Sequence, residues 1–270
     1  MTCKKHKVLD LFSGIGGFSL GLERTGGFKT VAFCEKCPEA TKVLKKHWAD
    51  VPVYQDVKNV TFKNLIKDGI EFDVLTAGFP CTDISKCNVN GEGINGKKSG
   101  LWKEVARIIR DAQPKWAILE NVPAIRSRGF EQLISEFDAC GYMGEWYIIP
   151  ASSIGAYHRR QRMFLIAYPD SNECSHTGRT PFFQRYVLEK TKRQEAPDGF
   201  VFNNTGEIAE GRLNYWTATQ WLHSSPRCRM VNGVPKRLDK NRLNQLGNSL
   251  VPQIPQLIGN AILQAECERK

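Results

Sequence analysis

An apolar strand that runs into a glycine-rich turn and then a helix stands near the start of the chain. Residues 7–18 read KVLDLFSGIGGF, and SLGLER follows with a helical pattern. Gly14, Gly16 and Gly17 allow the backbone to approach a ligand closely, and a helix N-terminus offers N–H groups that have no partner within the helix. The turn lacks the Lys-Ser/Thr pair of a P-loop. It predicts an α/β fold with a ligand beside this turn.

Two further strands are predicted to end on acidic residues. The segment TVAFCE ends on Glu35, about 20 residues after the glycines, where a carboxylate can accept hydrogen bonds from ribose hydroxyls. The segment VPVYQDV carries Asp56, a carboxylate that can accept from an adenine amino group. Surface charge would explain either acid alone. Three strand ends in register favour a nucleoside-containing ligand at one edge of a parallel sheet.

The segment 78–85 presents a cysteine at the end of another predicted strand. It reads GFPCTDIS and follows FDVLTA, a short and mostly apolar run. Pro80 fixes the backbone just before Cys81, so the thiol lies where ligands gather in parallel α/β sheets. Most free cysteines are inert small hydrophobes, so this segment alone leaves a purely structural role open. The loop 86–100, rich in glycine and asparagine and carrying Lys97 and Lys98, is either a lid over Cys81 or an ordinary surface loop.

A carboxylate and two arginines complete the set of candidate catalytic side chains. The buried strand PKWAILENV places Glu120 near its end, where partial desolvation raises a carboxyl pKa and suits it to share or donate a proton. Further on, Arg160 and Arg162 stand two apart on an extended segment and so share one face.

Charge and cysteine usage limit the class of protein. The net charge of +10 and a pI near 9.2 favour a polyanionic partner, nucleic acid first. Residues 158–242 hold 15 lysines and arginines against 8 acidic residues, so the excess is greatest there. Nine scattered cysteines are typical of a reducing cytoplasm, and the lone C-x-x-C of Cys34 and Cys37 predicts no metal site. No apolar run approaches the roughly 18 residues of a membrane span.

The order of these motifs resembles the DNA (cytosine-5) methyltransferases, particularly the compact bacterial and phage-like ones. The resemblance rests on DLFSGIGG, GFPC, ENV, RRQR and GNS in that order, and it covers residues 1–168 and 225–265. It implies an α/β fold with a Rossmann-like sheet that binds S-adenosylmethionine. Residues 1–168 plus 241–270 would form this discontinuous catalytic domain, because the C-terminal helix would return to pack on it. The polar, irregular segment 169–240 would be a small target-recognition domain.

The resemblance also implies roles for individual residues. Cys81 would attack carbon 6 of a flipped cytosine, Glu120 would protonate or hydrogen-bond ring nitrogen 3, Arg162 would hold the carbonyl oxygen, and Arg160 would support the site or a phosphate. Glu35 would bind the ribose, Asp56 the adenine amino group and Asn248 the methionine end of the cofactor. The remaining implied contacts are with the cofactor (Phe12, Gly14, Gly16, Gly17, Val57, Pro80 and Ser249) and with DNA (Ser85, Lys97, Lys98 and Arg160).

Four positions depart from the family pattern, namely Lys36, Thr82, His158 and Leu250, and Lys36 bears on the contact with adenine. The alternatives are an RNA cytosine-5 methyltransferase, a catalytically inactive DNA-binding regulator and a small-molecule methyltransferase. The chain lacks the Cys-Phe-Thr signature of the tRNA-acting branch, and its basic charge does not favour a small substrate. The expectation is a monomer in a bacterial cytoplasm or encoded by a phage, acting on double-stranded DNA, with a cognate restriction endonuclease as a possible partner.

Overall fold

A mixed sheet forms the centre of the computed structural model, which describes residues 4–80, 99–154, 160–170, 182–192, 201–202, 208–209 and 249–268. Seven strands within these ranges pair in the order β3-β2-β1-β4-β5-β7-β6. They are β1 (His6–Leu11), β2 (Phe28–Cys34), β3 (Val53–Tyr54), β4 (Val74–Ala77), β5 (Trp116–Asn121), β6 (Tyr142–Pro150) and β7 (Gln161–Pro169). The predicted Rossmann-like α/β sheet is confirmed. Its strand order reverses between β1 and β4, and ligands of open α/β sheets bind at such a point.

The direction of β7 differs from that of its neighbours. The first five strands are parallel, whereas β7 runs antiparallel to both β5 and β6. Glu120 at the end of β5 therefore pairs with Phe164 near the start of β7. The residues that open β7 thus lie at the same edge of the sheet as the residues that end β4 and β5.

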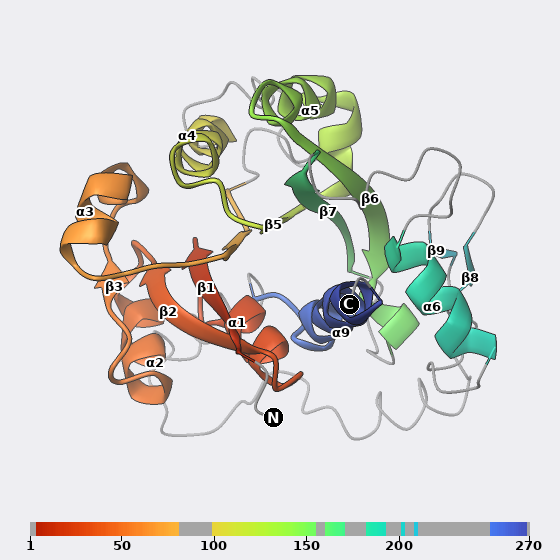
Figure 1. Ribbon diagram of the computed structural model, residues 1–270, viewed down its shortest axis with the longest axis horizontal. Helices are drawn as coiled ribbons and strands as arrows, with labels where there is room; N and C mark the ends of the chain where they lie inside the picture. The colour runs from red at the N-terminus through yellow and green to blue at the C-terminus, as the bar shows by residue number, and fades with distance from the viewer. Residues whose placement is uncertain are drawn as a thin grey trace, which may run out of the picture.

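Helices cover both faces of the sheet (Figure 1). Figure 1 shows α3 (Phe62–Lys67), α4 (Trp102–Ala112) and α5 (Phe130–Ala139) along one face. The other face carries α1 (Gly17–Glu23) and α9 (Gln253–Cys267), and Trp48, which follows α2 (Pro38–His47), packs edge-on against Phe33 of β2. Short 3₁₀ turns, η1 (Val57–Asn59), η3 (Ser99–Leu101), η4 (Pro123–Ser127) and η5 (Ala151–Ile154), connect these elements. No helix in the described ranges is long and apolar enough to cross a membrane.

Alternating side chains of the strands supply two apolar cores. In β1, Leu9 and Leu11 belong to the core beneath α3, α4 and α5, whereas Val8 belongs to the core beneath α1 and α9. This alternation follows from the two-residue period of a strand. The amphipathic helix α4 contributes Val105 and Ile109 to the first core, and burying each such side chain stabilises the fold by about 1.5–3 kcal/mol.

Glycines allow α1 and α9 to touch backbone to backbone. A Cβ at Gly21 would lie 2.2 Å from the carbonyl oxygen of Pro252, and one at Gly259 would lie 3.0 Å from the Leu22 side chain. At Gly21 a larger residue would require the backbone to shift, whereas at Gly259 it would press against the end of the Leu22 side chain. The C-terminal helix therefore packs on the first helix of the chain.

Helix α6 (Phe182–Lys192) also packs on the sheet, although it begins inside the segment predicted to be a recognition domain. Phe182 and Phe183 are buried in the same core as α9. The carboxylate of Glu145 on β6 accepts hydrogen bonds from the backbone N–H groups of both residues, at 2.9 and 3.2 Å. A small hairpin, β8 (Val201–Phe202) with β9 (Ile208–Ala209), is the other regular structure described in that segment. The division at residue 169 stays a prediction.

A buried histidine connects β1, α9, the start of β5 and the residue before β4. It lies at the amino edge of the sheet, opposite to the carboxyl ends of the parallel strands. His6 of β1 is 7% exposed, and its ring nitrogens lie 3.1 Å from Asp73 and 2.9 Å from Glu266 of α9. The indole N–H of Trp116, at the start of β5, donates to the other oxygen of Glu266 at 2.9 Å. Hydrogen bonds to Asp73 and Glu266 raise the pKa of His6 to about 9, against the opposing effect of burial.

We predict that this histidine makes stability depend on pH in the alkaline range. Because the folded pKa is about 9 and the unfolded value 6.5, the contribution is complete below pH 6.5 and is lost as the pH rises to 9. It amounts to about 3 kcal/mol at most. Thermal unfolding between pH 6 and 9.5 measures it. His6→Gln should flatten that profile, whereas His47→Gln, at an exposed position, should not. Equal slopes in all three proteins would contradict the assignment.

Candidate active site

The carboxyl edge of the sheet brings together most of the predicted site residues that the structure describes. Leu11 pairs with Cys34 on one side and with Ala77 on the other, and Ala77 pairs with Leu119. The residues that immediately follow these positions therefore lie side by side along one edge. They are Phe12 after β1, Glu35 after β2, Gly78 after β4 and Glu120 at the end of β5, with Asp56 beyond β3 and Arg162 at the start of β7.

The turn after β1 depends on left-handed backbone conformations. Phe12, Gly14 and Gly16 have φ values of 54°, 55° and 86°. Such a conformation is strained in phenylalanine and must be held by its surroundings. A Cβ at Gly14 would meet no atom within 4 Å, so the space beside this residue is open.

Packing accounts for the other two glycines of the turn. A Cβ at Gly16 would lie 2.7 Å from the Trp48 ring, and one at Gly17 would lie 2.9 Å from the carbonyl oxygen of Leu250. Ser249, just before Leu250, is half-buried, and its hydroxyl donates to that same carbonyl at 3.1 Å. The close approach at Gly17 therefore brings the end of the GNS motif against the glycine-rich turn, although the two are distant in sequence.

The two acids that follow β2 and β3 are both held by backbone N–H groups. Glu35 accepts from Gly14 and from Cys37, each at 2.7 Å, so its carboxylate fixes the glycine-rich turn. Asp56 caps the turn η1 by accepting from the Lys58 N–H at 3.0 Å, and its side chain is 38% exposed. Every carboxylate oxygen can accept more than one hydrogen bond, so both acids retain capacity for a ligand.

Neighbours of Asp56 differ in their exposure. The ammonium group of Lys36, which is 87% exposed, lies 4.0 Å from the Asp56 carboxylate. Val57 is buried in the core, and Arg107 of α4 donates to the carbonyl oxygens of Val57 and Val60 at 3.4 and 2.9 Å.

An ion pair between β5 and β7 is the most desolvated charged contact at this edge. The Glu120 carboxylate lies 2.7 Å from Nε of Arg162, and the two side chains are 16% and 22% exposed. Burial raises the pKa of Glu120, and the positive charges of Arg162 and Arg160 oppose that rise. A Cβ at Gly78 would lie 3.4 Å from the same carboxylate, so Glu120 stands directly beside the backbone that leads to Cys81.

Two residues near this edge stand in the quoted motifs, but the sequence analysis assigned them no role of their own. Asn121 is 5% exposed, donates from its side chain to the carbonyl oxygen of Phe79 at 3.3 Å and accepts from the Val122 N–H at 2.8 Å. It thereby ties the end of β5 to the residue before Pro80. The second, Asp10, is fully buried in β1. An acid inside the apolar run KVLDLF was the available sequence signal for it.

Several predicted residues lie outside the described ranges, and their placement stays a prediction. They are Cys81, Ser85, Lys97, Lys98 and Asn248. Arg160 is described: it precedes β7 with a φ of 21°, and its carbonyl oxygen accepts from the Ala151 N–H at 3.4 Å. Within the described part of the chain, no group of three or more His, Cys, Asp or Glu residues is arranged to hold a metal ion.

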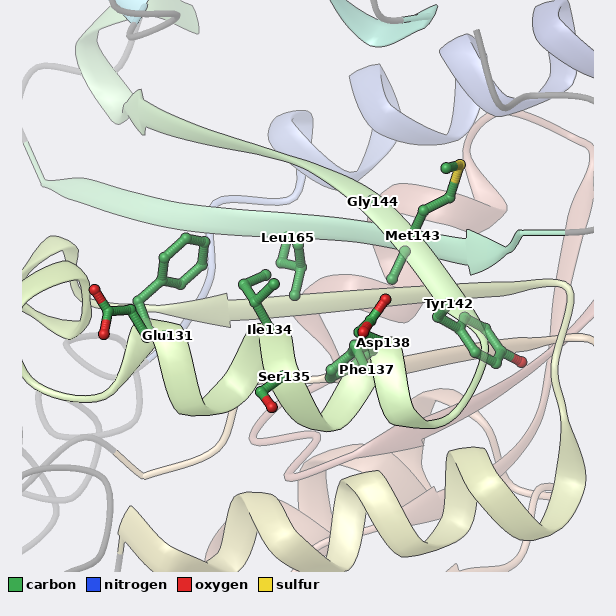
Figure 2. Close-up of a pocket in the computed structure, with 11 residues that line it drawn as sticks. Glu131, Ile134, Ser135, Phe137, Asp138, Tyr142, Met143, Gly144 and Leu165 are labelled. Carbon is green, nitrogen blue, oxygen red and sulfur yellow. The ribbon is translucent and has the colours of Figure 1, made fainter. Parts of the chain in front are cut away.

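A separate cavity of about 640 Å³ lies between α5 and the strands β6 and β7. Figure 2 shows Ile134 and Ser135 of α5 on one side of it and Met143 of β6 on the other. The residues that line it include none of the predicted site residues. The cavity is therefore distinct from the carboxyl edge.

A comparison with protein families agrees with the motifs gathered at this edge. A model of the C-5 cytosine-specific DNA methylase family matches residues 6–225. The chain belongs to this family. The match extends from β1 through the Glu120–Arg162 pair and beyond β9, so it includes the whole of the sheet.

Individual methylases agree with this assignment. Type II methyltransferase M.CviJI of Paramecium bursaria Chlorella virus IL3A is 37% identical over 163 residues, which are 60% of this chain and 42% of that protein. Type II methyltransferase M.HpaII of Haemophilus parainfluenzae is 31% identical over 266 residues, 96% of this chain and 67% of that protein. The chain thus spans only about two fifths of the length of M.CviJI, and the same holds for M2.BsuMI of Bacillus subtilis, at 41%.

The solved structure of the Entamoeba histolytica methyltransferase EhMeth shares the fold. Its TM-score is 0.61 at 17% sequence identity, and the superposition covers 97% of this chain and 99% of that one. At this identity the likeness concerns the fold alone.

We predict that Arg162 sets the protonation of Glu120 in this member of the family. Arg162→Gln removes the charge that opposes burial, so the pKa of Glu120 should rise further, whereas Arg162→Lys should retain part of that charge. A ¹³C NMR titration of protein labelled at glutamate carboxyls measures this, with the Glu120 signal assigned through Glu120→Gln. An identical titration midpoint in the wild type and Arg162→Gln would show that the ion pair does not control this carboxyl.

Proposed function

We propose that this methylase transfers a methyl group from S-adenosylmethionine to carbon 5 of a cytosine flipped out of duplex DNA. The observation that carries the proposal is the Glu120–Arg162 pair, because it stands at the end of β5 beside the backbone that leads to Cys81. A proton-sharing carboxyl, a guanidinium and a cysteine are the groups that activation of a cytosine ring requires.

The edge beyond β1, β2 and β3 fits the proposed cofactor. Open space lies beside Gly14, and the carboxylates of Glu35 and Asp56 can accept from ribose hydroxyls and from an amino group on adenine. Phe12 offers a partly exposed aromatic ring between them and β4. Asn248 and Ser249 would hold the methionine end, with Pro80, the Val57 backbone and the turn at Gly16 and Gly17 around the adenosine. Bound here, S-adenosylmethionine supplies an electrophilic methyl group.

The residues of the chain would make carbon 5 able to accept that methyl group. The Cys81 thiolate adds to carbon 6, while Glu120 hydrogen-bonds or protonates ring nitrogen 3 and so stabilises the charge that develops on the ring. Arg162 holds the carbonyl oxygen at position 2 and keeps Glu120 in place, and Arg160 supports this pair. Carbon 5 takes the methyl group and leaves S-adenosylhomocysteine. The carbon-5 proton then passes to solvent water, and the electron pair of its bond restores the ring as the Cys81 thiolate is expelled.

Duplex DNA is the proposed substrate. The target carbon cannot be reached within a base-paired stack, so the cytosine must be extruded, with the loop 86–100, including Lys97 and Lys98, closing over it. The net charge of +10 supports binding to a polyanion. Because α6 packs on the sheet, we place the target-recognition region after residue 192, within the remainder of segment 169–240. The relatives named type II methyltransferases make a cognate restriction endonuclease a further proposed partner.

Covalent trapping tests this function without knowledge of the recognised sequence. Long duplex DNA in which 5-fluorocytosine replaces every cytosine contains whatever site the enzyme reads. Fluorine at carbon 5 cannot leave as a cation, so elimination fails after methyl transfer. We predict a protein–DNA complex that survives denaturing electrophoresis and depends on S-adenosylmethionine.

Three variants sharpen the outcome of this experiment. Cys81→Ala should form no complex, and Glu120→Gln should form it more slowly, by roughly 10²–10⁴-fold, the usual worth of general acid catalysis. Cys267→Ala, an exposed cysteine at the end of α9, should behave as the wild type. Absence of a complex in the wild type, or its persistence in Cys81→Ala, would overturn the proposal.

A further inference from the structure

A carboxyl group that the proposed chemistry does not use lies beneath the glycine-rich turn. Asp10 is fully buried in β1, on the face that α1 covers. Burial raises its pKa to about 7, against hydrogen bonds from Thr76 and Ser19 that lower it. Placing a carboxyl inside a core costs free energy relative to an apolar residue of similar size. The Asp10 carboxyl is therefore better explained by the groups that it holds in place than by a gain in the stability of the fold.

The two oxygens of this carboxylate reach two different elements. Oδ2 accepts from the hydroxyl of Ser19 in α1 at 2.8 Å, and Oδ1 accepts from the hydroxyl of Thr76 in β4 at 2.7 Å. Two hydroxyl donors thus converge on one side chain, and they come from both sides of the point at which the strand order reverses.

The link to α1 controls the cofactor side of the edge. The residue that precedes α1, Gly16, has no side chain to cap the helix. Asp10 instead accepts from the hydroxyl of Ser19 in the first turn of the helix, so the strand holds the start of α1 in place. The Ser13 hydroxyl in turn donates to the Asp10 carbonyl. The strained turn at residues 12–17 is therefore anchored on Asp10 from both of its ends.

The hydrogen bond to Thr76 connects Asp10 to β4, the strand that precedes Gly78 and Cys81. Thr76 pairs directly with Asp10 across the two strands. Gly78, which lies against Glu120, follows two residues later, and Pro80 and Cys81 come next in the chain. Thr76 therefore stands in the strand whose next residues lead past Glu120 toward Cys81.

We propose that Asp10 is a positioning residue that couples the cofactor-binding turn to the strand that presents Cys81. One buried carboxylate fixes α1 through Ser19 and β4 through Thr76, and so holds the methyl donor and the nucleophile in register. The inference rests on the proposed function, since it concerns the relative placement of its two reactants.

The two links are separable by substitution. Ser19→Ala removes the donor on α1 and should weaken binding of S-adenosylmethionine, measured by calorimetry, by roughly tenfold, the effect of one hydrogen bond to a charged group. Thr76→Val is nearly isosteric and should instead slow formation of the 5-fluorocytosine complex at saturating S-adenosylmethionine, also by roughly tenfold. Asp10→Asn should impair both steps.

The chain offers a matched control for the threonine substitution. Thr30 of β2 is 1% exposed, and its hydroxyl has no hydrogen-bond partner in the described structure. Thr30→Val therefore makes the same change at an equally buried strand position that is not linked to Asp10, and neither affinity nor trapping rate should change. Thermal unfolding of each variant at the assay pH establishes that the compared proteins are folded.

A double-mutant cycle decides between coupling and a general loss of packing. In an Asp10→Ala background, Ser19→Ala and Thr76→Val should each have little further effect, because their partner is already gone. If both retain their full effects there, or if Thr76→Val acts no differently from Thr30→Val, the inference is wrong while the proposed function stands. Failure of the wild type to bind S-adenosylmethionine would instead count against the proposed function.

Discussion

The antiparallel direction of β7 is the constraint on which the site depends. Had β7 run parallel to β5, its first residues would lie at the opposite edge of the sheet, and Arg162 could not reach Glu120. The observed register instead sets Glu120 opposite Phe164, so a guanidinium from the start of one strand meets a carboxylate from the end of the next. The ion pair keeps a largely buried acid beside Gly78, at the strand end that leads to Cys81.

The amino edge of the sheet carries contacts that stabilise the fold, whereas the carboxyl edge carries the candidate site. At the amino edge, His6 joins β1 to α9 through Glu266 and so stabilises the fold. At the carboxyl edge, charged and polar groups hold the backbone of the loops, because Glu35 binds the glycine-rich turn and Asn121 binds the carbonyl oxygen of Phe79. Close packing between Gly17 and Leu250 brings two residues that are distant in sequence together at the same edge. The core between the edges keeps these contacts in fixed relation.

The strands and the acids at their ends could be predicted from the sequence because these signals are local. An apolar run predicts the strand, and Glu35 or Glu120 stands at or next to its end. It did not reach contacts made over long sequence separations. The packing of α6 under Glu145 belongs to this class, as do the approach of Leu250 to Gly17 and the hydrogen bonds of Asp10. The polar sequence around Phe182 and Phe183 predicts an irregular segment. In the structure both side chains are buried in the core that α9 also covers. A glycine in the sequence indicates that another part of the chain can pack closely there, but it does not show which residue does so.

Bisulfite sequencing of DNA from a host without cytosine methylation, in which this protein is expressed, tests the central claim most directly. The account predicts 5-methylcytosine at one short recurring sequence throughout the genome, and none when Cys81→Ala is expressed to the same level. The pattern of protected cytosines would also reveal the recognised site. Unmethylated DNA from cells that contain the folded wild-type protein, or equal methylation with Cys81→Ala, would contradict the account.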